Sequence, residues 1–159
     1  MGLIHTDIAL SNPREGSLRP VKVDALVDTG AITLCIPEHI ALQLKLQELE
    51  KREVHTADGR AGLVPYVGPV QVGFDNRNCF TGALVMGDTV LLGAVPMEDM
   101  DLVINPRLQQ VTVNPASPNI PTAVVKYCNP IDPNTRFSTP DRSRTGPGSA
   151  PARNYRSNT

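Results

Sequence analysis

Apolar and polar residues alternate in short runs along the first two thirds of the chain. This period-two pattern is typical of β-strands that bury one face. The runs are 4–10, 21–27, 32–36, 52–57, 60–66, 67–74, 79–86, 90–92, 102–104 and 111–113. Glycine, proline, asparagine and aspartate separate most of them, as in turns. The pattern predicts seven to nine short strands in a compact β-barrel or sandwich.

Helical periodicity is confined to two segments. Pro37 suits the first position of a helix, and leucines and isoleucines recur four residues apart as far as Leu49. A second segment, 93–100, predicts one or two helical turns around Pro96. The fold class expected from the whole pattern is therefore mainly β with one or two short helices.

A hairpin is predicted in the middle of the chain. Asp58-Gly59 stands between the runs 52–57 and 60–66. This dipeptide favours a two-residue β-turn, because both of its positions tolerate a positive φ. We therefore expect the two runs to pair with each other.

Composition changes near the end of the sequence. Eight of the fifteen prolines lie from Asn114 onward, where apolar periodicity is almost lost. Such a segment buries too little apolar surface to offset its ordering entropy. We predict one folded domain over residues 1–121 and a Pro/Arg-rich, disordered tail over 122–159.

Charge is distributed unevenly between these parts. Residues 126–159 hold six Lys/Arg against two Asp/Glu, whereas residues 1–125 hold nine against fourteen. An acidic domain is a poor electrostatic match for phosphate backbones, so no nucleic-acid partner is expected. The basic tail could touch nucleic acid weakly, but its few aromatic residues favour a solvated segment.

The cysteines indicate neither a disulfide framework nor a metal site. Cys35, Cys79 and Cys128 are odd in number and lack CxxC spacing. Cys35 lies in the apolar run ITLCI, which favours a buried residue over a nucleophile. No stretch has the length of a membrane span, and the first residues lack the pattern of a secretory signal. The expectation is a cytoplasmic protein without metal, cofactor or membrane contact.

One ionisable residue stands directly after an apolar strand. In Leu26-Val27-Asp28-Thr29-Gly30-Ala31, the carboxylate of Asp28 follows three apolar residues and precedes a Thr-Gly turn. Taken alone, the motif fits an ordinary turn in which Asp28 accepts backbone hydrogen bonds. Two further features follow in order: the Asp58-Gly59 hairpin, and Leu91-Leu92-Gly93-Ala94 before a short helix.

This order of features resembles the retroviral-type (retropepsin-like, clan AA) aspartic proteases, in particular the small free-standing bacterial type. The resemblance covers about residues 21–114 and implies a single closed β-barrel domain that acts as a C2 homodimer. It implies an aspartic endopeptidase, with Asp28 as the catalytic residue and peptides or proteins as substrates. The hairpin is more polar than the viral flaps, which leaves the substrate preference open.

The resemblance also implies roles for the neighbouring residues. Thr29 would hydrogen-bond across the dimer axis, Gly30 would permit the sharp turn, and Ala31 would form part of the cleft wall. Leu92 and Gly93 would support the loop from behind. The flap and substrate-binding residues would be Ala57, Asp58, Gly59 and Arg60.

The chemistry of this reaction requires two carboxylates. One acts as a base on water while the other, protonated, polarises the scissile carbonyl. The chain has a single Asp-Thr-Gly, and Asp88 lacks both the following glycine and a preceding apolar residue, so it is interpreted as a surface turn. The second carboxylate must then come from a second copy of the chain.

Two other functions remain open from the sequence. A catalytically silent protease fold could serve in dimerisation or peptide binding. A nucleic-acid-associated protein could act through its basic tail. Retention of Asp28, Thr29 and Gly30 favours the enzyme over the first, and the acidic domain counts against the second.

Overall fold

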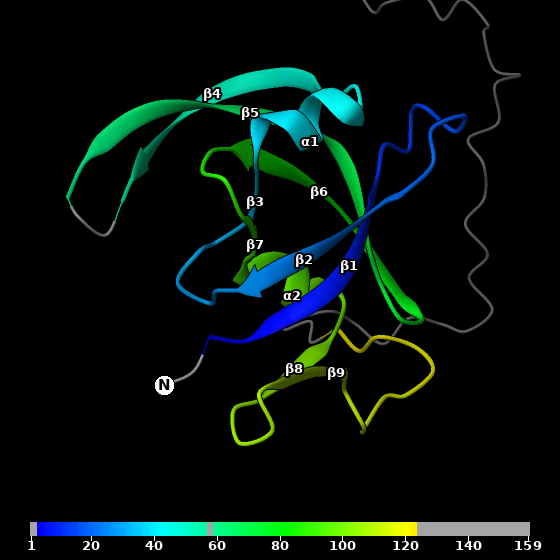
Figure 1. Cartoon of the computed structure of the whole chain (residues 1–159). Coiled ribbons are helices and arrows are strands. Elements are labelled where there is room, and N and C mark those ends of the chain that lie inside the picture. Colours follow the sequence, from blue (N-terminus) through cyan, green and yellow to red (C-terminus); the bar gives the residue numbers. More distant parts are fainter. Residues whose placement is uncertain (1–2, 57–58, 124–159) are drawn as a thin grey trace, which may run out of the picture. The chain divides into compact units, whose positions relative to one another are not determined.

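The computed structural model describes residues 3–56 and 59–123, which contain nine strands and two short helices (Figure 1). In chain order these elements are β1 (His5–Ser11), β2 (Val21–Val27), β3 (Leu34–Ile36), α1 (Glu38–Gln43), β4 (Gln47–His55), β5 (Ala61–Phe74), β6 (Arg77–Val85), β7 (Val90–Leu92), α2 (Ala94–Asp99), β8 (Leu102–Asn105) and β9 (Gln110–Val113). The expected mainly β fold with short helices is confirmed.

Six of the strands form a closed barrel. The sheet runs β1-β2-β7-β3-β6-β5, and β5 pairs back onto β1 to close the ring. Most neighbours are antiparallel, but β2 pairs with β7, and β3 with β6, in parallel. β4 pairs with the first part of β5, along the edge whose later part pairs with β1, and forms with it a long hairpin that extends away from the barrel in Figure 1.

The core fills the barrel with aliphatic side chains from every strand of the ring. Its fully buried members include Leu10, Leu34, Val72 and Leu92. Alternate residues of β5 and β6 point inward, which explains why period-two alternation located these strands. β2 and β7 therefore rest on a closed and well-packed core.

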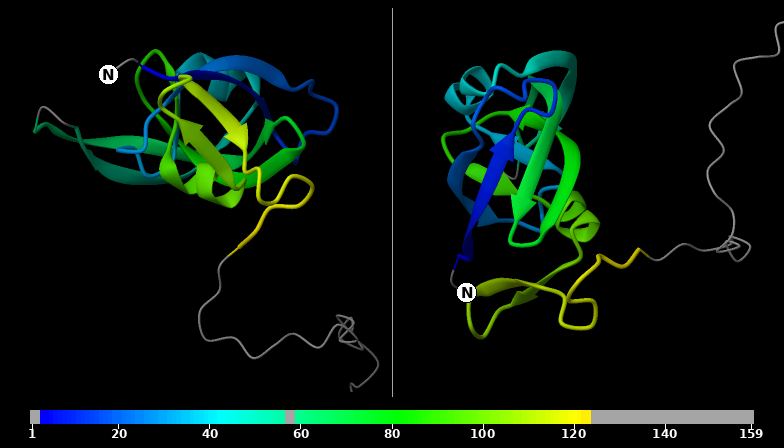
Figure 2. Two further views of the ribbon diagram at one scale, coloured as in Figure 1. Left: turned by 90° about the horizontal axis from the view of Figure 1, so that it is seen from below. Right: turned by 90° about the vertical axis from the view of Figure 1, so that its right-hand side faces the viewer.

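A second, two-stranded sheet lies outside the barrel. β8 and β9 pair in an antiparallel hairpin, with Leu102 opposite Val113 and Ile104 opposite Val111. The right-hand view of Figure 2 shows this hairpin below the barrel strands, and α2 contacts both β6 and β8. The predicted final hairpin over 102–113 is confirmed.

The long helix that leucine spacing suggested is wrong. α1 ends at Gln43, and residues up to Leu49 that had been assigned to it belong partly to β4. Lys45 has a φ of 50°, a left-handed conformation that ends the helix. Ile40 and Leu44 are buried but Leu42 and Leu49 are exposed, so the apolar residues of this segment do not form one buried face.

The middle hairpin also differs in detail from the expectation. The last pair of the ladder is His55 opposite Ala61, so five residues rather than two connect the strands. The amide of Thr56 donates to the carbonyl of Arg60 (2.9 Å) within this connection. The two expected strands 60–66 and 67–74 are one continuous strand, β5.

The segment after β9 is tied to the turn before β8. The carboxylate of Asp101 accepts hydrogen bonds from the Ser117 hydroxyl, the Asn114 side-chain amide (2.9 Å) and the Thr122 backbone amide (2.9 Å). These bonds, with a lesser contribution from Arg77, lower the pKa of Asp101 to about 2. Thr122 is the first residue of the predicted tail.

Most of that tail, from residue 124 onward, lies outside the described residues. The boundary at 121 and the disorder of 122–159 stay predictions. Within the described ranges, no helix has the length and hydropathy needed to cross a membrane.

Candidate active site

Asp28 is the first residue after β2, and its position is fixed by the strand beside it. Val27 pairs in parallel with Leu92 of β7. The amide of Asp28 continues this ladder by donating to the carbonyl of Leu92 (3.1 Å). The backbone of Asp28 is therefore held by the barrel, while its half-buried side chain lies at the barrel's edge.

A tight turn orients the Asp28 carboxylate. The amide of Ala31 donates to the carbonyl of Asp28 (3.1 Å), and the amide of Gly30 donates to its Oδ1 (2.9 Å). A Cβ on Gly30 would lie 3.1 Å from that same oxygen, so a side chain here would crowd the carboxylate. The local structure thus holds one carboxylate oxygen and leaves the other to the surroundings.

The loop is supported from behind by the segment that follows β7. Leu92 is completely buried. A Cβ on Gly93 would lie 2.3 Å from the carbonyl oxygen of Thr33 and 2.7 Å from that of Ala31, so only glycine fits here. The amides of Ala94 and Val95 then donate to the carbonyls of Ala31 (2.8 Å) and Ile32 (2.9 Å). Leu92 and Gly93 thus lie next to the Asp28 turn, and their supporting role stays a prediction.

The carboxylate opens onto a cleft of about 730 Å³ between this loop and the β4–β5 hairpin. Its lining residues come from the loop, from the barrel strands β3, β6 and β7, and from β4; they are Asp28, Gly30, Ala31, Ile32, Thr33, Cys35, Arg52, Glu53, Val54, His55, Thr56, Leu84, Met86 and Leu91. The barrel side is apolar and the hairpin side carries charges. A cleft with these walls fits an extended peptide better than a small ion.

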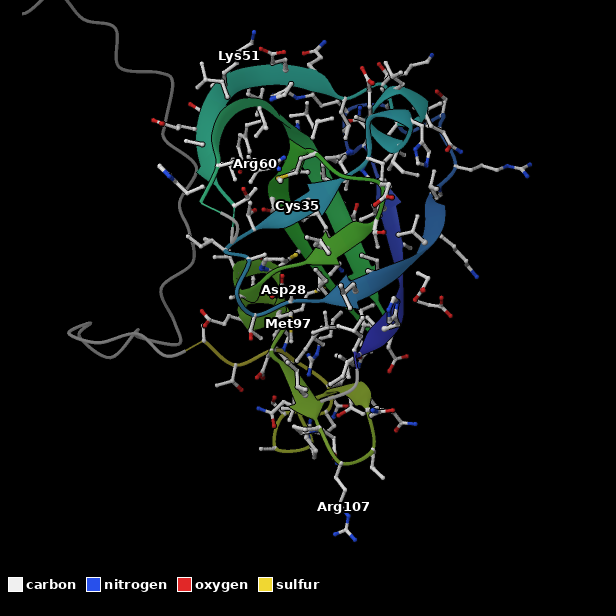
Figure 3. The ribbon with its side chains drawn as sticks, turned by 60° about the vertical axis from the view of Figure 1, so that its left-hand side comes forward. Asp28, Cys35, Lys51, Arg60, Met97 and Arg107 are labelled. Atoms are coloured by element: carbon white, nitrogen blue, oxygen red, sulfur yellow. The ribbon has the colours of Figure 1, made fainter. Side chains whose placement is uncertain are left out.

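Cys35 is buried, as expected, but it also lines the cleft. Burial and, to a lesser degree, the negative charge of Asp28 raise the pKa of its thiol. Figure 3 shows Cys35 on the hairpin side of Asp28, with Met97 on the other side. A raised pKa disfavours the thiolate, which agrees with the interpretation of Cys35 as a wall residue rather than a nucleophile.

The predicted flap residues are only partly described. Ala57 and Asp58 lie outside the described residues. Gly59 has a φ of 82° in the connection between β4 and β5, a conformation that favours glycine. Arg60 lines a second hollow of about 500 Å³ on the hairpin, together with Val54, Val64 and Met86. The structure thus brings Asp28, Gly30 and Ala31 to one cleft and leaves Arg60 beside it.

Other candidate groups lie apart from this cleft. Asp88 is in an exposed turn, where the Thr89 hydroxyl donates to its carboxylate (3.3 Å). Thr29 is exposed next to Asp28. Among the described residues, no group of three or more His, Cys, Asp or Glu side chains could hold a metal ion.

The sequence pattern missed most of the cleft wall. Leu84 is expected only as a strand residue, Cys35 as a buried residue of an apolar run and Leu91 as part of the Leu91-Leu92-Gly93-Ala94 segment, and no residue of β4 is expected at the site. Alternation reports which face of a strand is buried, but it does not say which buried residues stand beside a loop from another strand. The parallel pairing of β2 with β7 places the loop beside these strands, and this long-range contact leaves no local signal in the sequence.

A family model described as "gag-polyprotein putative aspartyl protease" matches residues 15–98, more than half of the chain. This match confirms the resemblance predicted from the sequence. No curated protein gives a significant match.

Three solved structures are similar to the chain at low identity. EIAV protease bound to an inhibitor is 22% identical, with 62% of this chain and 88% of that chain covered and a TM-score of 0.44. The retroviral protease-like domain of Ddi1 from Leishmania major is 14% identical, with 72% and 90% covered and a TM-score of 0.47. A retropepsin-like aspartic protease from Rickettsia conorii is 20% identical, with 58% and 78% covered and a TM-score of 0.32.

Proposed function

The chain belongs to the family of gag-polyprotein aspartyl proteases, and from this premise we propose that it is an aspartic endopeptidase whose site is built from two chains. Each chain supplies one Asp28. The observation that carries the proposal is the Asp28 carboxylate, held through one oxygen by the Gly30 amide in a cleft with an apolar barrel side and a charged hairpin side.

The reaction follows from two such carboxylates brought together. Two carboxyl groups about 3 Å apart cannot both ionise, so they share one proton. The ionised group takes a proton from water, whose oxygen attacks the scissile carbonyl carbon, while the protonated group donates to the carbonyl oxygen. Collapse of the tetrahedral intermediate breaks the C–N bond, and a proton passes to the leaving amine.

The single chain holds half of this machinery. Among the described residues, two carboxylates are candidates for the second group, and neither takes the place of a second Asp28: Asp88 lies in a separate exposed turn, and Glu53 is on the β4 side of the cleft. A C2 dimer supplies the missing group without any further residue, because each chain gives its Asp28 to the same axis.

Exposed apolar side chains beside the loop favour such a dimer. Ile32 is 76% exposed and Val95 is 48% exposed, and the amide of Val95 donates to the carbonyl of Ile32. Leu3, near the strand that pairs with β2, is 73% exposed. Apolar residues grouped on a surface favour a covering partner. Thr29, which is exposed next to Asp28, would contact its own copy across the axis.

The substrate is proposed to be an extended peptide segment. It would lie between the loop and the β4–β5 hairpin, with small or apolar side chains against Ala31, Leu84 and Leu91. Gly59 and Arg60, with Ala57 and Asp58, would form the tip of the flap that closes over it. The reaction itself uses no metal or cofactor, and no nucleic acid or membrane partner is proposed.

The test is the substitution Asp28→Asn in the full chain. The amide keeps the volume of the side chain but cannot act as the base, so hydrolysis of casein or a peptide library should fall by about 10²–10⁴-fold. The matched control, Asp88→Asn, changes an exposed aspartate outside the cleft and should leave the rate unchanged.

Thermal melting of both variants shows whether the fold is retained. Hydrolysis by folded Asp28→Asn at the wild-type rate would overturn the proposal. A folded wild-type protein that binds peptides without cleaving them, under conditions where it is dimeric, would favour the catalytically silent alternative instead.

A further inference from the structure

The β4–β5 hairpin leaves the barrel at a definite residue. β5 pairs with β6 only as far as Tyr66, opposite Leu84, whereas its pairing with β4 continues to Ala61 opposite His55. Residues 51–55 and 61–65 therefore form a two-stranded arm, called here the hairpin arm. Isolated two-stranded hairpins are marginally stable in water, so the direction of the arm depends on its base.

The hairpin arm has almost no core of its own. Most of its residues are exposed, including Leu63 at 71%, and the others are only partly buried. Yet residues 52–55 form one wall of the cleft that contains Asp28. The position of this wall must come from contacts at the point where the arm joins the barrel.

Tyr66 is pressed against the backbone of β6 at that point. A Cβ on Gly82 would lie 2.2 Å from Cζ of Tyr66, 2.3 Å from its hydroxyl oxygen and 2.5 Å from its Cε1. The ring therefore occupies the space that any side chain at position 82 would fill. An aromatic side chain that covers a glycine on the neighbouring strand fixes the relative position of the two strands.

Gly82 is in turn connected to the active-site loop. Its carbonyl accepts hydrogen bonds from the hydroxyl of Thr33 (3.3 Å) and from that of Thr81 (3.0 Å). Thr33 follows the Asp28 turn and lines the cleft. The Tyr66 ring therefore rests on the β6 backbone at Gly82, and the same backbone is hydrogen-bonded to Thr33 in the cleft.

Arg52 covers the ring from β4. Its guanidinium carbon lies 3.5 Å from the centroid of the Tyr66 ring, and its Nε donates to Oε1 of Glu50 (2.6 Å). Glu50 is paired with Tyr66 across the ladder and lies on the same face of β4 as Arg52. One ring therefore joins three strands: it lies against Gly82 of β6, belongs to β5, and is covered by Arg52 of β4.

We propose that Arg52, Tyr66 and Gly82 form an anchor that positions the hairpin arm over the substrate cleft. They are positioning residues: they act through the placement of residues 53–56 and take no part in the chemistry. The expected effect of the anchor on peptide hydrolysis rests on the proposed function. The anchor itself is a property of the folded chain and is testable without activity.

The expected strength of the anchor is modest. A cation–π contact at a partly exposed site changes an equilibrium by about two- to fivefold. The ion pair with Glu50 is surface-exposed and adds little by itself. The anchor therefore biases the arm toward the cleft but allows it to open, as substrate entry and product release require.

The experiment is amide hydrogen exchange of the full chain without substrate, comparing Arg52→Ala with Lys51→Ala. Lys51 is the adjacent residue on the opposite face of β4 and is the matched control. Arg52→Ala should speed exchange in the arm, at Val54 and Leu63, by about two- to fivefold, with barrel amides unchanged. Arg52→Lys should behave like Arg52→Ala, because an ammonium group lacks the planar stacking surface.

A double-mutant cycle with Tyr66→Leu separates the anchor from general packing. If Arg52 acts through the ring, the effects of Arg52→Ala and Tyr66→Leu on arm exchange should not add. Equal exchange in Arg52→Ala and Lys51→Ala, or additive effects in the cycle, would overturn the proposal. Arg52 is exposed, so its substitution should not unfold the protein and the exchange rates of the Arg52 variants can be compared directly.

Peptide hydrolysis gives the second readout. Arg52→Ala should raise KM about two- to fivefold with little change in kcat, because the carboxylates are untouched. If the wild-type protein hydrolyses no peptide, the proposed function fails while hydrogen exchange still decides the anchor. If hydrolysis is normal and arm exchange is unchanged by Arg52→Ala, the anchor alone fails.

Discussion

The loop that carries Asp28 and the hairpin arm face each other across one cleft, yet they are held in opposite ways. The loop is bonded to its neighbours through the amides of Asp28, Ala31, Ala94 and Val95, over a buried Leu92. The arm has a two-stranded ladder, exposed side chains and one cation–π contact at its base. In the proposed function, the rigid support lies where the carboxylate is placed and the loose support where the peptide enters.

This difference has a physical origin in the barrel. β2 and β7 are interior members of a closed ring, so both edges of each strand are paired and one face is buried. The arm extends beyond the last β5–β6 pair and gains neither edge pairing nor a core. Substitutions of the same kind should therefore have large effects under the loop and small effects in the arm.

Removal of leucine side chains gives the largest expected contrast. Leu92→Ala deletes a fully buried side chain under the loop and should lower the free energy of unfolding by about 2–5 kcal/mol. Leu63→Ala removes a side chain that is 71% exposed in the arm and should change the free energy of unfolding by less than about 0.5 kcal/mol. Urea unfolding of both variants measures the contrast, and similar losses would show that the arm is packed as firmly as the loop.

Glycine substitutions should give the next largest contrast. In Gly93→Ala the new Cβ meets the carbonyl oxygen of Thr33 at 2.3 Å, so the backbone must shift at a cost of about 1–3 kcal/mol. In Gly62→Ala the new Cβ meets nothing within 4 Å, and stability should be unchanged or slightly higher. Thermal melting tests both variants. A neutral Gly93→Ala would mean that the loop does not depend on close contact with this segment.

The smallest expected effect concerns Asp101, which lies outside both the loop and the arm. Its substitution tests whether stability can change while activity does not. The pKa of Asp101 is lowered to about 2, so its contribution to stability is present above its ordinary pKa of about 3.9 and is lost as the pH falls through 2. Asp101→Asn should therefore lower the melting temperature at pH 6 but not at pH 2.

Asp99→Asn is the matched control for this prediction, since Asp99 is exposed in the same part of the chain. Peptide hydrolysis at pH 6 should be unaffected by either substitution, because Asp101 touches neither the loop nor the arm. An equal decrease of the melting temperature at both pH values would contradict the assignment of the effect to ionised Asp101.

Much of this architecture could be predicted from local sequence patterns. β2 and β7 were located to the residue or nearly so, because their apolar runs face the core directly. The segment to Leu49 was assigned to a helix, because leucine spacing alone cannot show that Lys45 adopts a left-handed φ. The five-residue connection at 56–60 was likewise read as a two-residue turn from Asp58-Gly59.

The site shows the same limit. The turn at Asp28 could be anticipated because a short motif specifies it, whereas the supporting role of Leu92 and Gly93 is implied by the family resemblance and stays a prediction. The cleft wall could not be anticipated, because Cys35 reaches it through pairing with a strand far away in the sequence, and Arg52 through a hairpin whose place beside the loop has no local signal. Ring closure by β1 and β5, on which all of these positions depend, leaves no local signal.

The central claim is that two chains supply one active site, and subunit mixing tests it most directly. Wild-type protein is mixed with excess Asp28→Asn, and exchange of subunits is followed independently to completion. Heterodimers hold one ionisable carboxylate, so hydrolysis per mole of wild-type chain should fall steeply as the variant is added, and likewise on dilution below the dimer dissociation constant. Hydrolysis that stays constant per mole of wild-type chain under both treatments would show that Asp28 acts within a single chain and would contradict the two-chain site.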